Sequence, residues 1–439
     1  MATRIEFQKH GGPDVLKAVE FTPAAPGENE IQVENKAIGI NYIDTYIRGG
    51  LYPPPSMPSG LGTEAAGVVV KVGSAVKHIK EGDRVVYAQS ALGAYSSVHN
   101  VPADKAALLP NAISFEQAAA SFLKGLTVYY LLRKTYEIKP DEQFLFHAAA
   151  GGVGLIACQW AKALGAKLIG TVGNAQKAQR ALQAGAWQVI NYREESIVER
   201  LKEITSGKKV RVVYDSVGKD TWEASLDCLQ RRGLMVSFGN ASGAVTGVNL
   251  GILNQKGSLY VTRPSLQGYI TNREELEEAS NELFSLIASG VIKVDVADAQ
   301  KFALTDAQRR KVRQRFIHLA HEGKHILTAG LRQPAGAHVV EEQVPLVPDA
   351  LAVLDLDTPD QGKMHAPVAA LSPQLQRRAV LDQRRHLANV FQILVVADQR
   401  ALAIRADGKD RRRRLEDNRR PAGRAGSSES HVPGIRSVS

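Results

Sequence analysis

The stretch from Gln143 to Leu164, QFLFHAAAGGVGLIACQWAKAL, restricts the fold more than any other part of the sequence. Gln143 to His147 is typical of a short buried strand, and the residues after Gly154 are typical of an apolar helix. Glycines between a strand and a helix N-terminus let a phosphate group approach free backbone N–H groups and the positive end of the helix dipole. Ala149 replaces the first glycine of the G-x-G-x-x-G pattern, and tight turns without a ligand also contain glycines. The stretch alone therefore leaves a structural explanation open.

The residues that follow alternate between short apolar runs and helical segments. Strands of four to six residues that alternate with helices indicate βαβ units, and hence an α/β fold with a doubly wound parallel sheet. The glycine loop follows the first strand of this unit, as a dinucleotide-binding Rossmann domain requires. We assign residues 124–262 to that domain. The further strands are expected at Lys167 to Val172, Trp187 to Asn191, Val210 to Asp215 and Leu234 to Phe238, with Ser258 to Val261 as the candidate for a sixth strand. Helices are expected at 175–184, 197–205 and 221–228.

Residues 1–123 are predicted to form a β-rich, barrel-like domain, because short strand-like runs are separated there by glycine and proline turns. A helix is expected from about Phe115 to Ser121, with Ser114 as its N-cap. The clearest strand-like runs are Ile31 to Ile40, Ala65 to Val72 and Arg84 to Tyr87.

Residues 263–309 are predicted to return to the N-terminal domain. The segment RPSLQGYI, which begins at Arg263, is interpreted as a loop. An amphipathic helix is expected from Glu274 to Ser289, and a strand from Val291 to Val296. Packing of this segment on the N-terminal domain would leave a cleft between the two domains.

The composition changes from about Arg310. Residues 310–439 hold 22 Lys and Arg against 14 Asp and Glu, so most of the formal net charge of +10 lies there. This segment has no tyrosine or tryptophan, and Pro, Ala, Gln and charged residues dominate it. Such a composition offers little to bury, so the basic tail is predicted to be largely disordered. The charge therefore says little about what the rest of the chain binds.

The sequence favours a cytoplasmic protein without a membrane span. No apolar run approaches the roughly 18 residues of a spanning helix, and the N-terminus lacks the apolar core of a secretory signal. Cys158 and Cys228 fall in predicted helices and are too few for a disulfide framework, which favours a reducing compartment.

Residues at the end of the second Rossmann strand favour NADP over NAD. An acidic residue at this position would hold the ribose 2′-hydroxyl of NAD, but Gly173 and Asn174 stand there. Lys177 lies one helical turn further and suits a 2′-phosphate, and Tyr192 could stack on adenine or bind that phosphate. Lysines on helices are more often only solvated, so this alternative stays open for Lys177.

Several motifs together resemble the medium-chain dehydrogenase/reductase superfamily: Gly62 to Val69 (GTEAAGVV), Val72-Gly73, Gly82 to Val85 (GDRV) and Ala148 to Gly154. Within it, the sequence resembles the zinc-independent quinone oxidoreductases of the zeta-crystallin group, and most closely the bacterial ones, over about residues 1–309. The resemblance implies a GroES-like N-terminal domain, a Rossmann domain, a homodimer, and NADPH held in the interdomain cleft.

A zinc site is not expected. Zinc-containing members of the superfamily carry histidine in a Gly-His-Glu motif, and Thr63 occupies the middle position here. They also use a cysteine in the segment that matches Ile38 to Tyr46, and this segment has none. The cysteines of a structural zinc site are missing as well, and zinc needs three or four converging protein ligands.

The resemblance also implies where the cofactor lies. It places Asn41, Tyr42, Asp44, Thr45 and Tyr46 on the nicotinamide side of the cleft. Thr127 and Tyr130 would approach the cofactor, and Gly151, Gly152 and Val153 would hold the pyrophosphate. Gly173, Lys177 and Tyr192 would hold the adenosine end. The further cofactor-binding residues that it implies are Ser216, Val217, Phe238, Gly239 and Ser242, and Pro264, Ser265 and Leu266 in a loop over the nicotinamide.

These observations predict an NADPH-dependent quinone reductase. Asn41, Tyr46 and Tyr52 could donate hydrogen bonds to a quinone oxygen as negative charge develops on it, although a structural role is the alternative, and the commoner one for a tyrosine in a proline-rich loop. A rival activity is reduction of α,β-unsaturated carbonyls. A rival of another class is nucleic-acid binding by the tail through Arg411 to Arg414, which is disfavoured because no aromatic residues are interleaved for base stacking.

The family resemblance stops near Arg310. The family continues there with a helix and a short apolar strand and supplies an arginine toward the cofactor, whereas position 317 here is Ile317. The abrupt change suggests a shifted reading frame or a fusion. Resequencing the gene across codons 300 to 320 tests this hypothesis, and an intact frame would refute it.

Overall fold

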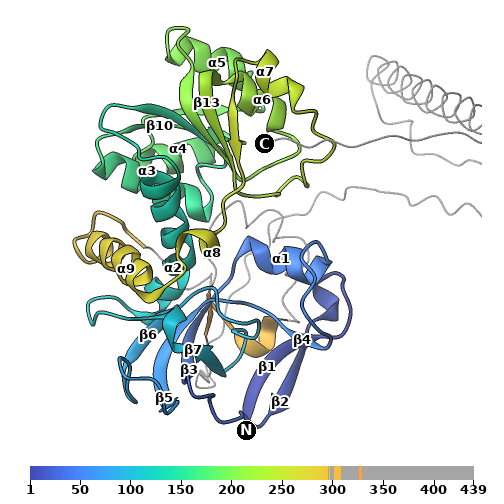
Figure 1. Ribbon diagram of the computed structural model, residues 1–439, viewed down its shortest axis with the longest axis vertical. Helices are drawn as coiled ribbons and strands as arrows, with labels where there is room; N and C mark the ends of the chain where they lie inside the picture. Colours follow the sequence, from blue (N-terminus) through green and yellow to red (C-terminus); the bar gives the residue numbers. More distant parts are fainter. Residues whose placement is uncertain (295, 297–300, 308–325, 329–439) are drawn as a thin grey trace, which may run out of the picture. The chain divides into compact units, whose positions relative to one another are not determined.

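The computed structural model describes residues 1–294, 296, 301–307 and 326–328 (Figure 1). The predictions for the remaining residues, including disorder over most of the basic tail, lie outside the described residues. In the part of the chain that the structure describes, no helix has the length and apolarity needed to cross a membrane.

The N-terminal domain is built mainly from antiparallel strands. Their bounds are β1 Ala2–Phe7, β2 Lys17–Phe21, β3 Glu30–Gly39, β4 Ser59–Gly60, β5 Ala65–Val72, β6 Arg84–Tyr87, β7 Val98–Pro102, β8 Ala106–Leu108, β15 Lys301–Ala303 and β16 Ile326–Thr328. One sheet has the order β2-β1-β4, and a larger sheet has the order β15-β16-β3-β5-β6-β8, with β7 also paired to β3. Ile5, Ile31 and Val85 are fully buried in its core. The three predicted runs are confirmed as β3, β5 and β6.

The second domain has the predicted doubly wound sheet. Its strands are β9 Gln143–Phe146, β10 Lys167–Val172, β11 Gln188–Asn191, β12 Val210–Asp215, β13 Leu229–Ser237 and β14 Tyr260–Thr262. They are all parallel, and within the described residues their order is β11-β10-β9-β12-β13-β14. The order reverses at β9, because β10 and β12 lie on its two sides. Ligands of such sheets bind outside the carboxyl ends of the strands at this switch point.

The helices between these strands agree with the predicted α/β alternation. Their bounds are α3 Gly152–Ala163, α4 Ala175–Gln183, α5 Ile197–Ile204, α6 Trp222–Asp227 and α7 Gly251–Gln255. Side chains cap two of them at the expected type of residue. Asn174 Oδ1 accepts the Lys177 N–H at 2.8 Å at the start of α4, and Ser196 Oγ accepts the Glu199 N–H at 3.4 Å at the start of α5.

The helix predicted from about Phe115 to Ser121 was predicted too short at its C-terminal end. Ser114 caps α2 as predicted, and its Oγ accepts the Gln117 N–H at 3.1 Å, but α2 runs over Phe115–Tyr129 and continues as a π-helix over Tyr130–Thr135. The helix passes through Gly125, where an added Cβ would lie 2.5 Å from Leu283 Cδ1. Gly125 is therefore a close packing contact and not a helix stop. Consequently α2 crosses the domain boundary expected at residue 123.

The return segment differs from its prediction in three places. Part of the predicted loop RPSLQGYI forms the short helix α8, Leu266–Tyr269, because Ser265 caps it. The predicted strand from Val291 to Val296 is absent at the described positions 291–294 and 296, although Ile292 and Val294 are buried in alternation as in a strand. The strand β15 follows later. Within the tail expected to be disordered, β16 pairs with β3 and β15, since Ile326 and its neighbours form a short apolar, strand-favouring run.

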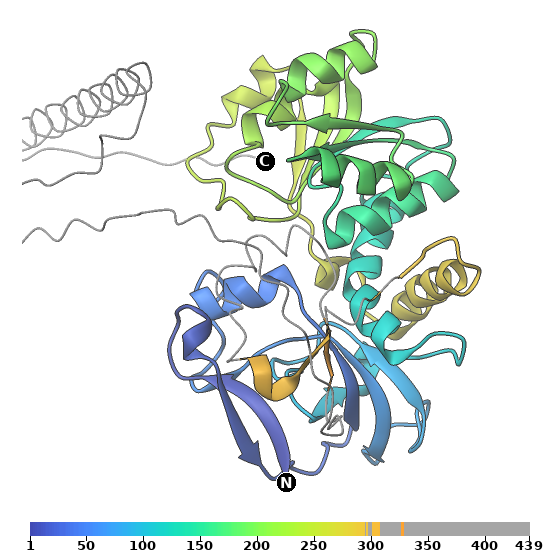
Figure 2. The ribbon, with the colours of Figure 1, turned by 180° about the vertical axis from the view of Figure 1, so that it is seen from behind.

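The helix α9, Arg273–Ala288, confirms the amphipathic helix predicted in this segment. Figures 1 and 2 show α9 beside α2, which lies between the Rossmann sheet and the strands of the N-terminal domain. The rings of Phe122 in α2 and Phe284 in α9 stack with centroids 5.7 Å apart. One continuous core includes Val86 of the N-terminal domain and Phe146 of the Rossmann sheet, so the two domains share buried side chains around α2.

Candidate active site in the interdomain cleft

The glycine loop between β9 and α3 is a tight turn with close backbone packing. Ala148 has a left-handed backbone with φ of 54°, and the Gly151 N–H donates to the Ala148 carbonyl oxygen at 2.9 Å. A Cβ on Gly154 would lie 2.4 Å from the Ala148 oxygen, so only glycine fits. The first N–H groups of α3 have no acceptor within the helix. The turn therefore has the chemistry of a pyrophosphate site, with Gly151 as the N-cap.

A buried polar network beneath this loop was missed by sequence reasoning. The His147 ring contacts Thr171 Oγ1 through Nδ1 at 3.0 Å and Ser225 Oγ through Nε2 at 2.9 Å. The Ser225 hydroxyl in turn donates to Asp215 Oδ2 at 2.8 Å. Burial lowers the pKa of His147, which favours its neutral form. The network links the residue after β9 to β10, β12 and α6 at the switch point and so supports the loop.

The first part of the cleft is a cavity of about 480 Å³, which is large enough for a small ligand. Fifteen of the predicted site residues line it, and they come from both domains. They are Asn41, Tyr42, Tyr46, Tyr52, Thr127, Tyr130, Gly151, Gly152, Val153, Ser216, Phe238, Gly239, Pro264, Ser265 and Leu266.

The second part of the cleft, of about 430 Å³, shares Ala148, Gly151 and Ala241 with the first and extends along the Rossmann domain. The predicted residues that line it are Gly151, Gly173, Lys177, Tyr192, Val217 and Ser242. Glu195 lines it too, but its carboxylate accepts the Asn191 N–H at 2.9 Å and pairs with Arg200 at 3.5 Å.

Two predicted cofactor-binding residues, Asp44 and Thr45, are not among the residues that line either part of the cleft. Both lie in the first turn of α1, Tyr42–Gly49. The buried Asp44 accepts the Asn41 N–H and the Tyr95 hydroxyl, each at 2.8 Å, and Thr45 Oγ1 donates to the Tyr42 carbonyl at 2.6 Å. They shape the turn that carries Asn41 and Tyr42.

The tyrosines of the N-terminal domain bridge the cleft. The Tyr46 hydroxyl accepts the Asn240 N–H at 3.0 Å, and the Tyr52 hydroxyl accepts Asn240 Nδ2 at 2.8 Å. The Tyr42 hydroxyl donates to the Ala241 carbonyl at 3.2 Å. Burial raises the pKa of Tyr46, so its hydroxyl keeps its proton. A hydroxyl that accepts a hydrogen bond can still donate its own proton, so Tyr46 and Tyr52 can each donate one hydrogen bond.

Sequence reasoning also missed Arg263 as a cleft residue. Its guanidinium donates to Ser237 Oγ at 3.0 Å, to the Gly239 carbonyl at 2.9 Å and to the Tyr52 hydroxyl at 3.3 Å. The arginine follows β14 at the carboxyl end of the sheet, and this position was the available signal.

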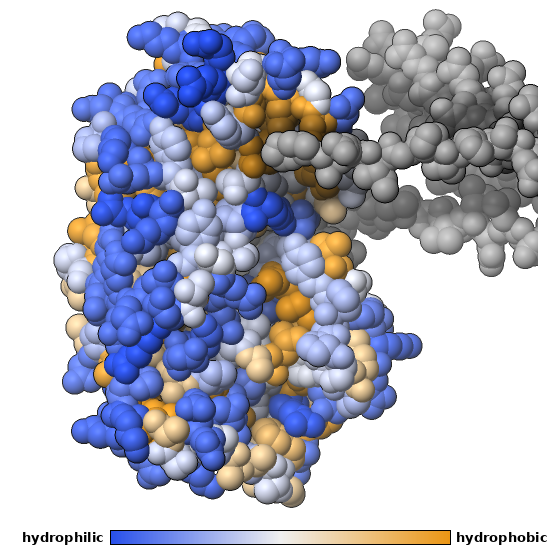
Figure 3. All heavy atoms as spheres, in the orientation of Figure 1, coloured by the Kyte–Doolittle hydropathy of each residue, from blue (hydrophilic) through white to orange (hydrophobic). Residues whose placement is uncertain are grey.

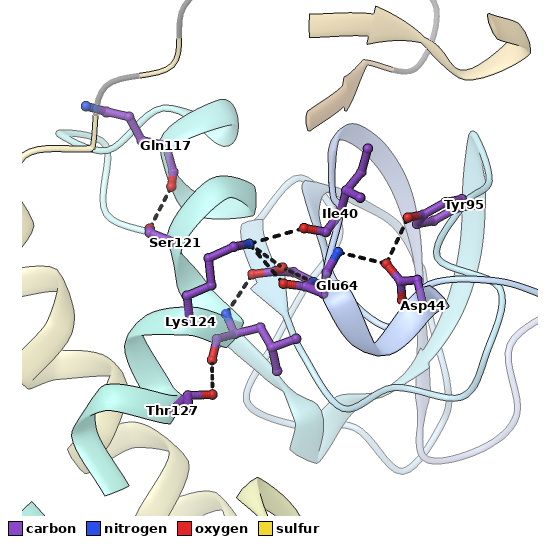
Figure 4. Close-up of polar contacts among 10 residues, drawn as sticks. Ile40, Asp44, Glu64, Tyr95, Gln117, Ser121, Lys124 and Thr127 are labelled. Carbon is purple, nitrogen blue, oxygen red and sulfur yellow. Dashed lines mark hydrogen bonds and ion pairs between the residues drawn. The ribbon is translucent and has the colours of Figure 1, made fainter. Parts of the chain in front are cut away.

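A second missed cleft residue, Lys124, lies in an otherwise apolar part of α2, and Figure 4 shows it reaching toward Ile40 and Glu64 of the N-terminal domain. Lys124 Nζ donates to Asn41 Oδ1 at 2.9 Å and lies 3.8 Å from Glu64 Oε2. Burial raises the pKa of Glu64, while the Lys124 ammonium lowers it. A lysine in an apolar helix was the signal, because lysine is rarely buried without a partner.

Within the described residues, no three His, Cys, Asp or Glu side chains come together as metal ligands. Cys158 and Cys228 are both buried free thiols of the Rossmann domain. Burial raises the pKa of each to about 12.

A GroES-like domain, a Rossmann sheet and a cleft between them define a medium-chain dehydrogenase/reductase. The family model for the alcohol dehydrogenase GroES-like domain matches residues 27–111, and the model for zinc-binding dehydrogenases matches residues 152–286. Over 309 residues, the chain is 90% identical to quinone oxidoreductase 1 of Escherichia coli, which covers 70% of this chain and 94% of that protein. The chain belongs to the quinone oxidoreductase family.

Solved structures agree with this assignment. The crystal structure of E. coli quinone oxidoreductase complexed with NADPH matches at a TM-score of 0.73 and 85% identity, covering 74% of this chain and 99% of that one. A more distant relative is the 2-haloacrylate reductase of Burkholderia sp., which is 42% identical over 69% of this chain and 92% of its own length.

The buried Asp44 gives the stability of the folded chain a testable pH dependence. Burial raises its pKa from the ordinary 3.8 to about 6, although the hydrogen bonds from Asn41 and Tyr95 lower it. Between these two pH values the unfolded chain loses the proton while the folded chain keeps it, so stability falls as pH rises. We predict that Asp44→Asn removes a fall of about 3 kcal/mol in the free energy of unfolding between about pH 4 and pH 6.

Urea unfolding at a series of pH values measures this fall. Asp141→Asn is the matched control, because the Asp141 side chain is 84% exposed and pairs with Lys167 at the surface. The control should keep the pH dependence of the starting protein. Equal pH dependence in both variants would contradict the prediction.

Proposed function

We propose that the chain is an NADPH-dependent quinone reductase that needs no zinc. The observation that carries the proposal is the continuous cleft, which joins the glycine loop and Lys177 to the polar side chains of Asn41, Tyr46 and Tyr52. The named activity of relatives at 90% and 88% identity supports it.

The residues of the cleft fit NADPH. The N-terminus of α3, with Gly151, Gly152 and Val153, suits the pyrophosphate, because glycine lets the phosphates reach the backbone N–H groups. Lys177 and Tyr192 lie where they would meet the 2′-phosphate, beside Gly173. Other predicted contacts along the cleft are Thr127, Tyr130, Ser216, Val217, Phe238, Gly239, Ser242, Pro264, Ser265 and Leu266.

The bound nicotinamide supplies the reducing power, and the protein supplies orientation and exclusion of water. Asn41, Tyr46 and Tyr52 line the cleft, and in this proposal they donate hydrogen bonds to the acceptor oxygen as negative charge develops on it. The tyrosines hold this position through Asn240, so the two domains have to stay together for the donors to face the cleft.

The direct test measures NADPH oxidation by the full chain with 1,4-benzoquinone and naphthoquinones. We expect turnover well above the enzyme-free rate, and turnover at the enzyme-free rate would refute the function. Enals serve as comparison substrates, because reduction of α,β-unsaturated carbonyls is the rival activity; the 90% identity to a quinone oxidoreductase, against 42% to a 2-haloacrylate reductase, favours quinones.

Lys177 is expected to select NADPH over NADH. Removing a cation from a phosphate contact costs about 1.5–3 kcal/mol. We predict that Lys177→Met raises the KM for NADPH about 10- to 100-fold and leaves the KM for NADH unchanged. Steady-state kinetics with both cofactors measure the change. Lys208→Met, outside the cofactor cleft, is the control, and equal losses with both cofactors would overturn the assigned role.

A homodimer is also proposed, formed along β14. This strand ends the sheet order, so one of its edges has no strand partner among the described residues, and such edges readily pair with another chain. Tyr260 and Val261 of β14 are 55% and 39% exposed, and Leu250 at the start of α7 is 74% exposed. Figure 3 shows apolar side chains gathered on the Rossmann domain where β13 and α7 lie. We predict a dimer for the full chain and a monomer for Tyr260→Lys in sedimentation velocity; a monomeric starting protein would contradict this.

We further propose a cytoplasmic location, which the two free, buried thiols support. Cell fractionation tests this location. The boundaries 1–123, 124–262 and 263–309 are proposed as domain limits, and the first limit falls inside α2, which packs in the core of both domains. Limited proteolysis tests this sharing, and a cut within α2 that releases stable halves would contradict it.

A further inference from the structure

The neighbours of Asn41 determine which way its amide faces. A lysine ammonium can only donate and an ionised carboxylate can only accept hydrogen bonds. Lys124 Nζ lies 2.9 Å from Asn41 Oδ1, and Glu64 Oε2 lies 2.6 Å from Asn41 Nδ2. A flipped amide would place its nitrogen against the ammonium and its oxygen against the carboxylate. Both contacts would then be repulsive, so only one orientation is compatible with this pair.

The carboxylate of Glu64 is held by two hydrogen-bond donors and one ion pair. Its Oε1 accepts the Leu123 N–H at 2.6 Å, and its Oε2 accepts Asn41 Nδ2 and faces Lys124 Nζ at 3.8 Å. The side chain of Glu64 is fully buried, and that of Lys124 is 9% exposed. In such a low-dielectric position each contact is stronger than in water. The ion pair is therefore a rigid support for the amide, and α2 supplies both Leu123 and Lys124.

One amide hydrogen of Asn41 remains for a ligand. Lys124 contacts both Asn41 Oδ1 and Glu64, so the three groups close a ring in which the Asn41 nitrogen gives one hydrogen to Glu64. The second hydrogen has no partner recorded among the described residues. Asn41 and Lys124 both line the cleft, whereas Glu64 lies behind them.

We propose that Lys124 and Glu64 are positioning residues that hold the Asn41 amide with its nitrogen as a donor to the acceptor oxygen in the cleft. This inference rests on the proposed function, in which Asn41 donates to a quinone oxygen. Lys124 and Glu64 act through Asn41, because their own polar atoms are engaged with it and with the backbone of Ile40 and Leu123.

A double-mutant cycle tests the proposal with the full chain and 1,4-benzoquinone. Loss of one preorganised donor costs about 10²-fold in kcat, which we expect for Asn41→Ala. Lys124→Met should lower kcat at least about 10-fold with NADPH affinity unchanged. In the Asn41→Ala background, Lys124→Met should lower kcat less than about 2-fold, because the amide through which Lys124 acts on the substrate is already absent. Equal losses in both backgrounds would overturn the proposal.

A second variant guards against misfolding. Lys124→Met leaves the buried Glu64 without its cation, so the cycle is repeated with the charge-neutral pair Lys124→Met/Glu64→Gln. This double variant should bind NADPH as tightly as the starting chain. It should lower kcat when Asn41 is present and leave kcat unchanged in the Asn41→Ala background. Full turnover by the double variant with Asn41 present would overturn the proposal. Lys202→Met, which removes an exposed lysine paired with Glu199 at 2.8 Å, is the control and should keep full turnover.

The outcomes for the function and for this inference can be told apart. A starting chain that fails to oxidise NADPH with any quinone refutes the function. In that case the positioning role is tested by measuring the quinone Kd of each variant of the same cycle in its NADP⁺-bound form. An active starting chain with an additive cycle refutes only the positioning role.

Discussion

The packing of α2 against both domains is the constraint on which the cleft depends. The helix has Phe122 stacked on Phe284 of α9, and its buried residues belong to a core that reaches the Rossmann sheet and the N-terminal strands. A shared core of this kind resists sliding of one domain on the other, because interiors are close-packed. The same helix carries Lys124 and Thr127 to the cleft. One buried element therefore sets both the spacing of the cleft walls and part of its polar lining.

The polar groups of the cleft are held by partners that lie behind them. The glycine loop rests on His147, Thr171 and Ser225, and the Asn41 amide rests on Lys124 and Glu64. A buried polar group without a partner is costly, so each group that faces the cleft needs such support. The tyrosines are held differently, through the Rossmann residue Asn240, and their position depends on contact between the domains.

The places where sequence reasoning was wrong have a common physical cause. It ended a helix at Ser121 and missed that Gly125 serves contact with Leu283. It read the alternating residues Ile292 and Val294 as a strand, although no partner strand pairs with them in the described residues. Each error concerns what a residue packs against, and periodicity carries no information on that.

The sequence by itself determined the class of the fold and the location of the glycine loop between β9 and α3. Alternating short strands and helices specify a parallel sheet, and glycines after the first strand specify a turn that side chains cannot enter, as at Gly154. The tertiary structure alone decided that Lys124 faces Asn41 and Glu64, that Arg263 meets Tyr52, and that Asn240 joins the two walls of the cleft. These contacts connect residues far apart in the chain, so they follow from how the two domains pack and not from any local pattern.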